Sequence, residues 1–123
     1  MGTRDYDAGA TVTFDGVLTN YGEHYSASTS VFQCPYNGIY MFSVHYNSAD
    51  TSSMHCEIMR DAMRLTEGWA TTHTRDSSGS AQVITECLAG EDVWVRAGFD
   101  KTKMYGDSTR TSSHFTGYML YSY

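Results

Sequence analysis

The segment "NGIYMFSVHY", residues 37 to 46, restricts the fold more than any other part of the chain. Its β-branched and aromatic content is typical of a strand, in which alternate side chains lie on opposite faces. One face is apolar throughout and carries Tyr40, Phe42, Val44 and Tyr46. The other begins apolar and becomes polar, in the order Ile39, Met41, Ser43 and His45. A single hydrophobic core accounts for the first face, and the apolar part of the second needs a separate explanation.

Short segments with a similar alternation recur about every 8 to 12 residues, a spacing that is typical of a β-sandwich or barrel. Examples lie near residues 11–18, 31–32, 54–59, 67–74, 81–88 and 91–99. No window shows the 3.6-residue period of an amphipathic helix. Within two of these segments, the side chains expected on one face are Cys56 and Ile58, and Val93, Val95, Ala97 and Phe99. The sequence therefore predicts an all-β fold.

The length of 123 residues fits one domain, which can bury a core without the help of a metal or a disulfide. The opening "MGTRDYDAGA" lacks the apolar region of a signal peptide, and a Met-Gly start is common in engineered sequences. We therefore expect a flexible leader over residues 1–9 and a folded domain over residues 10–123.

The 14 acidic and 8 basic residues give the chain a formal net charge of -6. This charge repels nucleic-acid phosphates and anionic membrane surfaces, and no run of 18 apolar residues is present to span a bilayer. The sequence therefore predicts a soluble chain with no nucleic-acid partner and no membrane insertion.

The cysteines leave the compartment open. Cys34, Cys56 and Cys87 match no metal or redox spacing, and they allow three single disulfide pairings with one thiol left over. Free cysteine is also among the most frequently buried residue types. Buried thiols are therefore favoured, and a disulfide remains an alternative.

Four fragments follow one another along residues 11 to 123: "VTFDGVLTNYGEHY", "STSVFQCPYNGIYMFSV", "CLAGEDVWV" and "SSHFTGYMLYSY". In order and spacing they resemble the globular domain of complement component C1q and its relatives, the C1q/TNF-like superfamily. The matching positions are Asn20, Gly22, Tyr25, Thr29, Phe32, Pro35, Gly38, Tyr40, Phe42, Gly90, Val93, Trp94, Phe115 and Gly117. Ser30, Glu91 and Cys87 depart from the Gly, Asp and Leu that are usual in the family.

The resemblance implies a ten-stranded jelly-roll sandwich of the C1q/TNF type that assembles as a compact homotrimer. Tyr40, Phe42 and Val44 would then face the interior of the sandwich. Ile39 and Met41 would lie in a subunit interface or under a loop, which would explain the second apolar row.

Catalysis is not expected. The five histidines are scattered, and the chain has no Gly-x-Ser-x-Gly elbow that would support a serine nucleophile. We interpret the histidines as surface or hydrogen-bonded side chains, and Trp69 and Trp94 as anchors of the core or of an interface.

A calcium site is a candidate because calcium often accompanies this family. Asp76 precedes "SSGS" at a position where calcium-binding members have an acidic residue, and Glu67 lies more loosely at the second acidic position. Carboxylate, hydroxyl and carbonyl oxygens are the ligands that calcium prefers. A solvated turn is the alternative.

The polar segment "DKTKMYGDSTRTSS" contains a local group of basic residues with one tyrosine, although the chain as a whole is acidic. Loops on a rigid β scaffold commonly carry recognition, and cations there could hold sulfate, phosphate or carboxylate groups. The candidate ligand-binding residues are Lys101, Lys103, Tyr105 and Arg110.

Taken with the resemblance, these features lead us to expect a secreted, extracellular recognition head of innate immunity. Its ligands would be microbial or self surface molecules such as polysaccharide, lipopolysaccharide or protein. The alternative is a structural trimerisation head or a cytokine-like head that binds a receptor.

Overall fold

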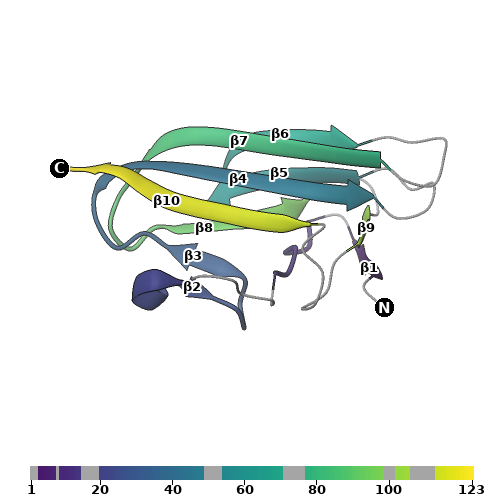
Figure 1. The fold of residues 1–123 in the computed structure, drawn as a ribbon, viewed down its shortest axis with the longest axis horizontal. Helices are drawn as coiled ribbons and strands as arrows, with labels where there is room; N and C mark the ends of the chain where they lie inside the picture. Colours follow the sequence, from purple (N-terminus) through teal and green to yellow (C-terminus); the bar gives the residue numbers. More distant parts are fainter. Residues whose placement is uncertain are drawn as a thin grey trace.

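A computed structural model of the chain describes residues 3–7, 9–14, 20–48, 54–70, 77–98, 102–105 and 113–123. Within these ranges the chain forms ten strands in two sheets and one short 3-10 turn, Tyr21–Glu23 (Figure 1). Both sheets are antiparallel, and they pack face to face as a sandwich. The all-β fold expected from the sequence is confirmed.

The first sheet is built around its longest strands. β4 (Gly38–Ser48) pairs along its length with β7 (Ser77–Cys87) on one side and β10 (His114–Ser122) on the other. β9 (Thr102–Tyr105) meets the end of β4 at one residue and pairs with β1 (Thr3–Tyr6). Part of the segment expected as a leader, residues 1–9, thus lies in a strand, while the boundary of the domain stays a prediction.

The second sheet contains the remaining five strands. In spatial order they are β2 (Tyr25–Ser26), β3 (Val31–Gln33), β8 (Asp92–Ala97), β5 (Met54–Arg60) and β6 (Met63–Ala70). The turn between β5 and β6 is held by Asp61, whose side chain accepts a hydrogen bond from the Asp92 N–H at 3.0 Å. This turn sets the register that brings the charged residues of β5 and β6 opposite each other.

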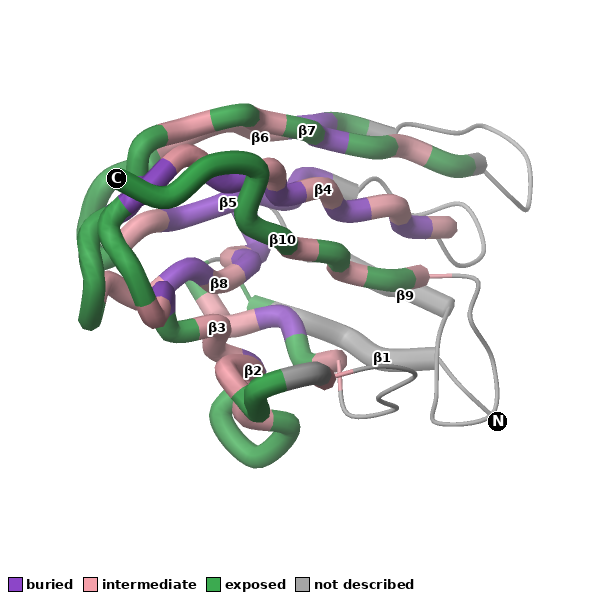
Figure 2. Tube along the Cα trace, turned by 60° about the vertical axis from the view of Figure 1, so that its left-hand side comes forward, coloured by how far each residue is buried: buried purple, intermediate pink, exposed green. Residues whose placement is uncertain are grey.

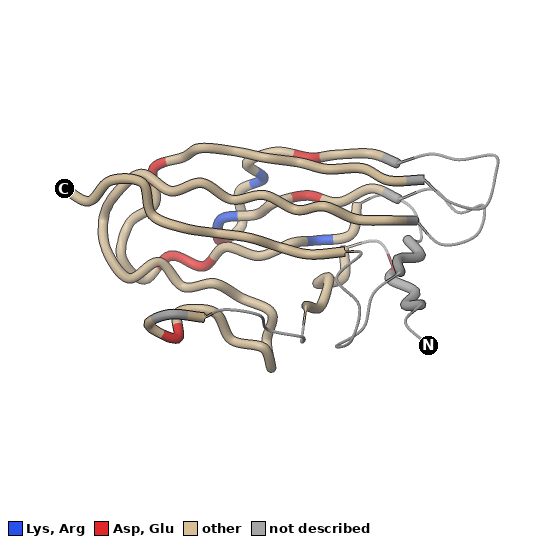
Figure 3. Tube along the Cα trace, in the orientation of Figure 1, with Lys and Arg blue, Asp and Glu red and all other residues tan. Residues whose placement is uncertain are grey.

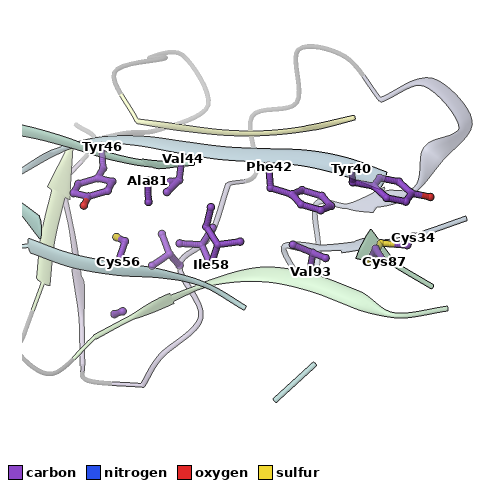
Figure 4. Packing of buried hydrophobic residues seen from close by; sticks show 13 residues of the cluster. Cys34, Tyr40, Phe42, Val44, Tyr46, Cys56, Ile58, Ala81, Cys87 and Val93 are labelled. Atoms are coloured by element: carbon purple, nitrogen blue, oxygen red, sulfur yellow. A yellow bond between two sulfur atoms is a disulfide. The ribbon is translucent and has the colours of Figure 1, made fainter. Parts of the chain in front are cut away.

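The core lies between the two sheets and follows the alternation read from the sequence (Figure 4). The first apolar row of β4 is fully buried: Tyr40, Phe42, Val44 and Tyr46. Facing it from the second sheet are Cys56, Ile58, Val93, Val95 and Ala97, as expected. Phe99 lies outside the described residues.

Aromatic rings fill one part of the core. Phe42 lies 5.9 Å from Tyr40 and 6.2 Å from Phe115 between ring centroids, and both pairs are nearly parallel. Gly117 is opposite Phe42 in the neighbouring strand, and a Cβ atom there would lie 2.6 Å from the Phe42 ring. The glycine of "FTGY" is therefore needed for the close approach of β10 to Phe42.

The edge of the sandwich where β6 meets β7 depends on two further glycines. A Cβ atom at Gly68 would lie 2.5 Å from the Tyr46 hydroxyl, and one at Gly79 would lie 2.7 Å from the Tyr46 ring. The Tyr46 hydroxyl is buried and has no hydrogen-bond partner among the described residues. Burial raises the pKa of Tyr46, and the nearby Cys56 adds to the increase.

A disulfide joins Cys34 to Cys87 at the other end of the core (Figure 4). Cys87 ends β7 in the first sheet and Cys34 follows β3 in the second, so the bond connects the two sheets. Cys56 is the free thiol, and burial with the charge of Glu57 raises its pKa to about 12. The alternative of a disulfide is thus the one found, with one of the three open pairings. The favoured interpretation of a buried free thiol holds only for Cys56, although all three cysteines are buried.

The tryptophans are not part of the core, so that half of their interpretation is wrong. Trp69 on β6 is 50% exposed, and its ring stacks on His55 with centroids 3.7 Å apart. Trp94 lies on the outer side of β8 and donates a hydrogen bond to the Asp61 carbonyl at 3.1 Å. Strand alternation explains both positions, because Val93 and Val95 occupy the inner side of β8 and Gly68 is the buried neighbour of Trp69 on β6.

Candidate binding surfaces

The outer side of the first sheet carries a row of apolar residues, which we call the apolar face. In the register of the sheet, Tyr118 of β10 lies opposite Met41 of β4, which lies opposite Ile84 of β7. Ile39 and Tyr121 form the next pair along the strands. Directly paired residues in antiparallel strands point to the same side, so these five side chains share one surface.

The apolar face is strongly exposed in the single chain. Ile84 is 61% exposed, Tyr118 47% and Tyr121 64%, while Ile39 and Met41 are half-buried by their neighbours. Figure 2 shows the exposed second half of β10, and Figure 3 shows that β4 and β10 carry no charged residue. A contiguous apolar surface of this kind usually marks a site of protein association.

The apolar face gives way to a polar region along the same strands. Ser43 is opposite Thr116 on one side and Gln82 on the other. At the far end His45 and His114 lie opposite each other, with ring centroids 5.4 Å apart. This cross-strand histidine pair was not expected from the sequence, because it depends on the register of β4 with β10.

The outer side of the second sheet carries a group of ionisable side chains instead, which we call the charged cluster: His55, Glu57, Arg64, Glu67 and Arg96. Glu57 accepts hydrogen bonds from Arg96 Nε at 2.8 Å and from Arg64 Nη1 at 3.2 Å. Arg64 Nη1 also lies 3.4 Å from Glu67 Oε2. Two carboxylates are thus balanced by two guanidinium groups.

His55 completes the charged cluster. Its Nε2 atom lies 2.5 Å from Glu67 Oε1, and the residue is only 1% exposed. The indole of Trp69 covers one side of the ring, and the backbone of Gly98 packs so closely that a Cβ there would lie 1.7 Å from Nδ1. The imidazole is therefore fixed in position with one nitrogen directed at Glu67.

The electrostatics of Glu57 follow from these contacts. Burial by itself raises the pKa of the Glu57 carboxyl, because a charged group loses hydration. The hydrogen bonds from Arg96 and Arg64 and the positive charge of Arg96 outweigh that effect, so the pKa lies below its ordinary value. Glu57 is thus held as a carboxylate at neutral pH.

Of the two predicted calcium ligands, the structure describes only Glu67. Its carboxylate contacts His55 and Arg64, whereas Asp76 lies outside the described residues. The calcium site stays a prediction. Among the predicted ligand-binding residues, Lys101 and Arg110 also lie outside the described residues.

The other two predicted ligand-binding residues lie on β9. Lys103 is opposite Asp5, and Tyr105 is opposite Thr3, at the paired strands β1 and β9. These positions place the two residues on the strand next to the edge strand β1 of the first sheet. Their role in ligand binding stays a prediction.

The sequence interpretation missed the charged cluster, although two signals were present. The spacing His55-x-Glu57 puts both side chains on one face of a strand. Asp61 is a residue type that favours turns, and folding the chain there places Glu57 opposite Glu67. Both signals together would have predicted three possible metal ligands on one surface.

None of the helices formed by the described residues is long and apolar enough to cross a membrane.

The two antiparallel sheets, with long central strands and a shared aromatic core, define a jelly-roll domain of the C1q/TNF type. A model of the C1q domain matches residues 2–120, so the chain belongs to the C1q domain family.

Two solved structures support this fold. The globular domain of zebrafish complement 1qA protein aligns with a TM-score of 0.71 and 18% identity, and the alignment covers 99% of this chain and 96% of that one. The Eiger TNF structure from S. frugiperda aligns with a TM-score of 0.74 and 14% identity, over 94% of this chain and 83% of that one. At these identities the likeness concerns the fold alone.

Curated relatives have clearer sequence similarity. Complement C1q tumor necrosis factor-related protein 2 of Mus musculus is 29% identical over 112 residues, which are 90% of this chain and 38% of that protein. The related protein 5 of Rattus norvegicus is 32% identical over 116 residues, 89% of this chain and 45% of that protein. The chain therefore spans less than half the length of either relative. No enzymatic family is indicated by these matches.

Proposed function

We propose that the chain is a non-enzymatic recognition head that assembles as a homotrimer and binds microbial or self surface ligands in innate immunity. The observation that carries this proposal is the apolar face, because its exposed Ile84, Tyr118 and Tyr121 need a covering partner. A second and a third copy of the chain are partners of the right chemistry, since closed rings of identical subunits bury such faces against one another.

Burying the apolar face at a threefold interface would leave the second sheet and the loops at the ends of the sandwich facing outward. Three identical copies of each outward surface would then bind a repetitive ligand together. Polysaccharide and lipopolysaccharide surfaces are repetitive, so weak single contacts would add up to strong binding. Proteins on such surfaces are further candidate ligands.

An extracellular, secreted location is part of the proposal. The Cys34–Cys87 disulfide supports it, since disulfides persist in oxidising compartments and are rare in the cytosol.

A binding screen tests the function. The chain would be applied to arrays of glycans and lipopolysaccharides and to whole bacteria at physiological salt, beside the variant Ile84→Glu, which places a charge on the apolar face. We expect the wild type to bind at least one surface. The variant should bind the same surface at least about a hundredfold more weakly, because avidity is lost. Absence of any binding by the wild type would contradict recognition of these ligands.

A cytokine-like, receptor-binding head is the second candidate. It is favoured by the names of the two curated relatives, which are tumor necrosis factor-related proteins. Saturable binding of the trimer to animal cells, without binding to any glycan or bacterial surface, would support this candidate over the first.

A further inference from the structure

The charged cluster contains the ligand set of a metal site. One nitrogen of His55 and one carboxylate oxygen each from Glu57 and Glu67 lie within 4.8 Å of one another. Neighbouring ligands of a tetrahedral zinc ion lie roughly 3.3 to 3.5 Å apart, given metal–ligand distances near 2.1 Å. Side-chain movements of about one ångström would therefore bring the three atoms to zinc-binding distances.

The chemistry of the ligands favours zinc over calcium. An imidazole nitrogen suits zinc and other transition metals, whereas calcium and magnesium prefer sites built from oxygen alone. Two of the ligand residues are buried, since His55 is 1% and Glu57 4% exposed. The side chain of Glu67 is 33% exposed, which leaves one side of the site accessible to a metal and to a water as fourth ligand.

The position of a cation is taken by Arg64. Its Nη1 atom lies between the two carboxylates, 3.2 Å from Glu57 Oε2 and 3.4 Å from Glu67 Oε2. Arg96 holds the other oxygen of Glu57, Oε1, at 2.8 Å and can stay in place. The side chain of Arg64 is 45% exposed, so it can turn into solvent without leaving a buried charge unpaired.

We propose that His55, Glu57 and Glu67 bind a zinc ion on the outer side of the second sheet, and that Arg64 occupies the site of the ion until zinc displaces it. The ring of His55 is held by Trp69 and Gly98, so little freedom is lost when the metal binds. A fixed nitrogen and a fixed buried carboxylate form a ready site to which Glu67 adds the third ligand.

Calorimetric titration of the metal-stripped chain with zinc chloride tests the proposal, and the absorption of bound Co²⁺ reports the coordination geometry. We expect one ion per chain and a tetrahedral cobalt spectrum. Glu67→Gln should weaken zinc binding by more than about a hundredfold, because losing a ligand costs more than losing a residue that supports one. Glu67 is partly exposed, so this variant should fold normally.

Glu86→Gln is the matched control, since it removes an exposed carboxylate from β7 on the other sheet. Zinc affinity should not change in this variant. An equal loss of affinity in Glu67→Gln and Glu86→Gln would show a general effect of charge and overturn the proposal.

A second variant distinguishes a metal site from a purely structural group of ion pairs. Arg64→Met removes the competing cation and should raise the zinc affinity roughly fivefold to tenfold, the size expected from half-exposed ion pairs. Arg60→Met serves as its control, because Arg60 bonds to Glu86 and Glu91 away from the site. Unchanged or weaker zinc binding in Arg64→Met would contradict the displacement of Arg64.

The pair His45 and His114 could bind zinc by itself, so His114→Ala completes the test. We expect this variant to retain the tetrahedral site. Loss of binding in His114→Ala with normal binding in Glu67→Gln would assign the zinc to the histidine pair and overturn the proposal, as would the absence of zinc binding by the wild type.

Discussion

The outer sides of the two sheets differ in which kind of side chain is buried: the first sheet exposes apolar side chains, and the second buries ionisable ones. The apolar face of the first sheet consists of side chains that water solvates poorly, yet Ile84 and Tyr121 are largely exposed. The second sheet carries ionisable side chains, yet His55 and Glu57 are buried. Within the chain Glu57 is paired with two arginines and His55 with Glu67, whereas the exposed apolar side chains have no cover from the described residues. Under the proposed assembly, the first sheet is the side that a second copy would cover.

The largest expected effect comes from charging the apolar face. Ile84→Glu should reduce the assembly from a trimer of about 41 kDa, three times the 13.7 kDa chain, to a monomer, because a carboxylate cannot be buried there without a partner. Met63→Glu makes a similar change at an exposed residue of the second sheet and should leave the trimer intact. Light scattering at micromolar concentration measures both. A monomeric wild type would contradict the proposal that the apolar face is covered by other copies of the chain.

The core supports both outer surfaces, so Phe42→Ala should weaken both sheets together. We expect the free energy of unfolding to fall by about 3 to 5 kcal/mol, since the ring is fully buried between Tyr40 and Phe115 and its loss leaves a cavity. Chemical denaturation measures the change. A midpoint equal to that of the wild type would mean that the ring does not pack in the core.

Loosening the connection between the sheets should have a somewhat smaller effect. The double variant Cys34→Ala with Cys87→Ala removes a bond between residues 53 positions apart, which should lower the free energy of unfolding by about 2 to 4 kcal/mol. Reducing agent should lower the stability of the wild type by a similar amount and leave that of the double variant unchanged. Equal sensitivity of both proteins to the reductant would argue against the bond.

The charged cluster should give the smallest change, and that change depends on pH. Because the pKa of Glu57 is lower in the folded chain than its ordinary value near 4.3, the ionised group stabilises the fold above about pH 4.3. This contribution is lost as the pH falls through the folded-state pKa. Glu57→Gln should therefore unfold about 1 to 3 kcal/mol more easily at pH 7, and the difference should shrink at pH 3. Denaturation at both pH values measures it, and a constant difference would contradict the role of the carboxylate.

The sequence predicts the inner side of each sheet much better than the outer side. The phase of β4 and β8 was assigned correctly, because Phe42, Val93 and Val95 belong to unbroken apolar rows whose burial depends on alternation alone. β6 has no such row around Trp69, so the size and apolar character of the indole suggested a buried position, and the stack on His55 was missed.

Contacts between strands require a register, which alternation within one strand does not contain. The pairing of Glu57 with Glu67 depends on the turn at Asp61, and that of His45 with His114 depends on how β10 returns beside β4. The Cys34–Cys87 bond was likewise not determined by the sequence, since the cysteine count allowed three pairings equally. The candidate surfaces are therefore properties of the assembled sheets, and the sequence predicted only some of their members.

The packing of Tyr46 against Gly68 and Gly79 also constrains how this sequence can change over time. A Cβ atom at Gly68 would lie 2.5 Å from the Tyr46 hydroxyl and also 2.5 Å from the Ser80 carbonyl oxygen, and one at Gly79 would lie 2.7 Å from the Tyr46 ring and 2.9 Å from the Trp69 carbonyl oxygen. A smaller residue at position 46 would therefore relieve only part of the overlap, because the backbone of the neighbouring strand stays in place. Position 46 itself can change more easily, because Tyr46→Phe keeps the ring and removes a hydroxyl that has no described partner. The two glycines should thus resist enlargement whatever residue occupies position 46, because the close approach of β6 and β7 leaves no room for a Cβ atom.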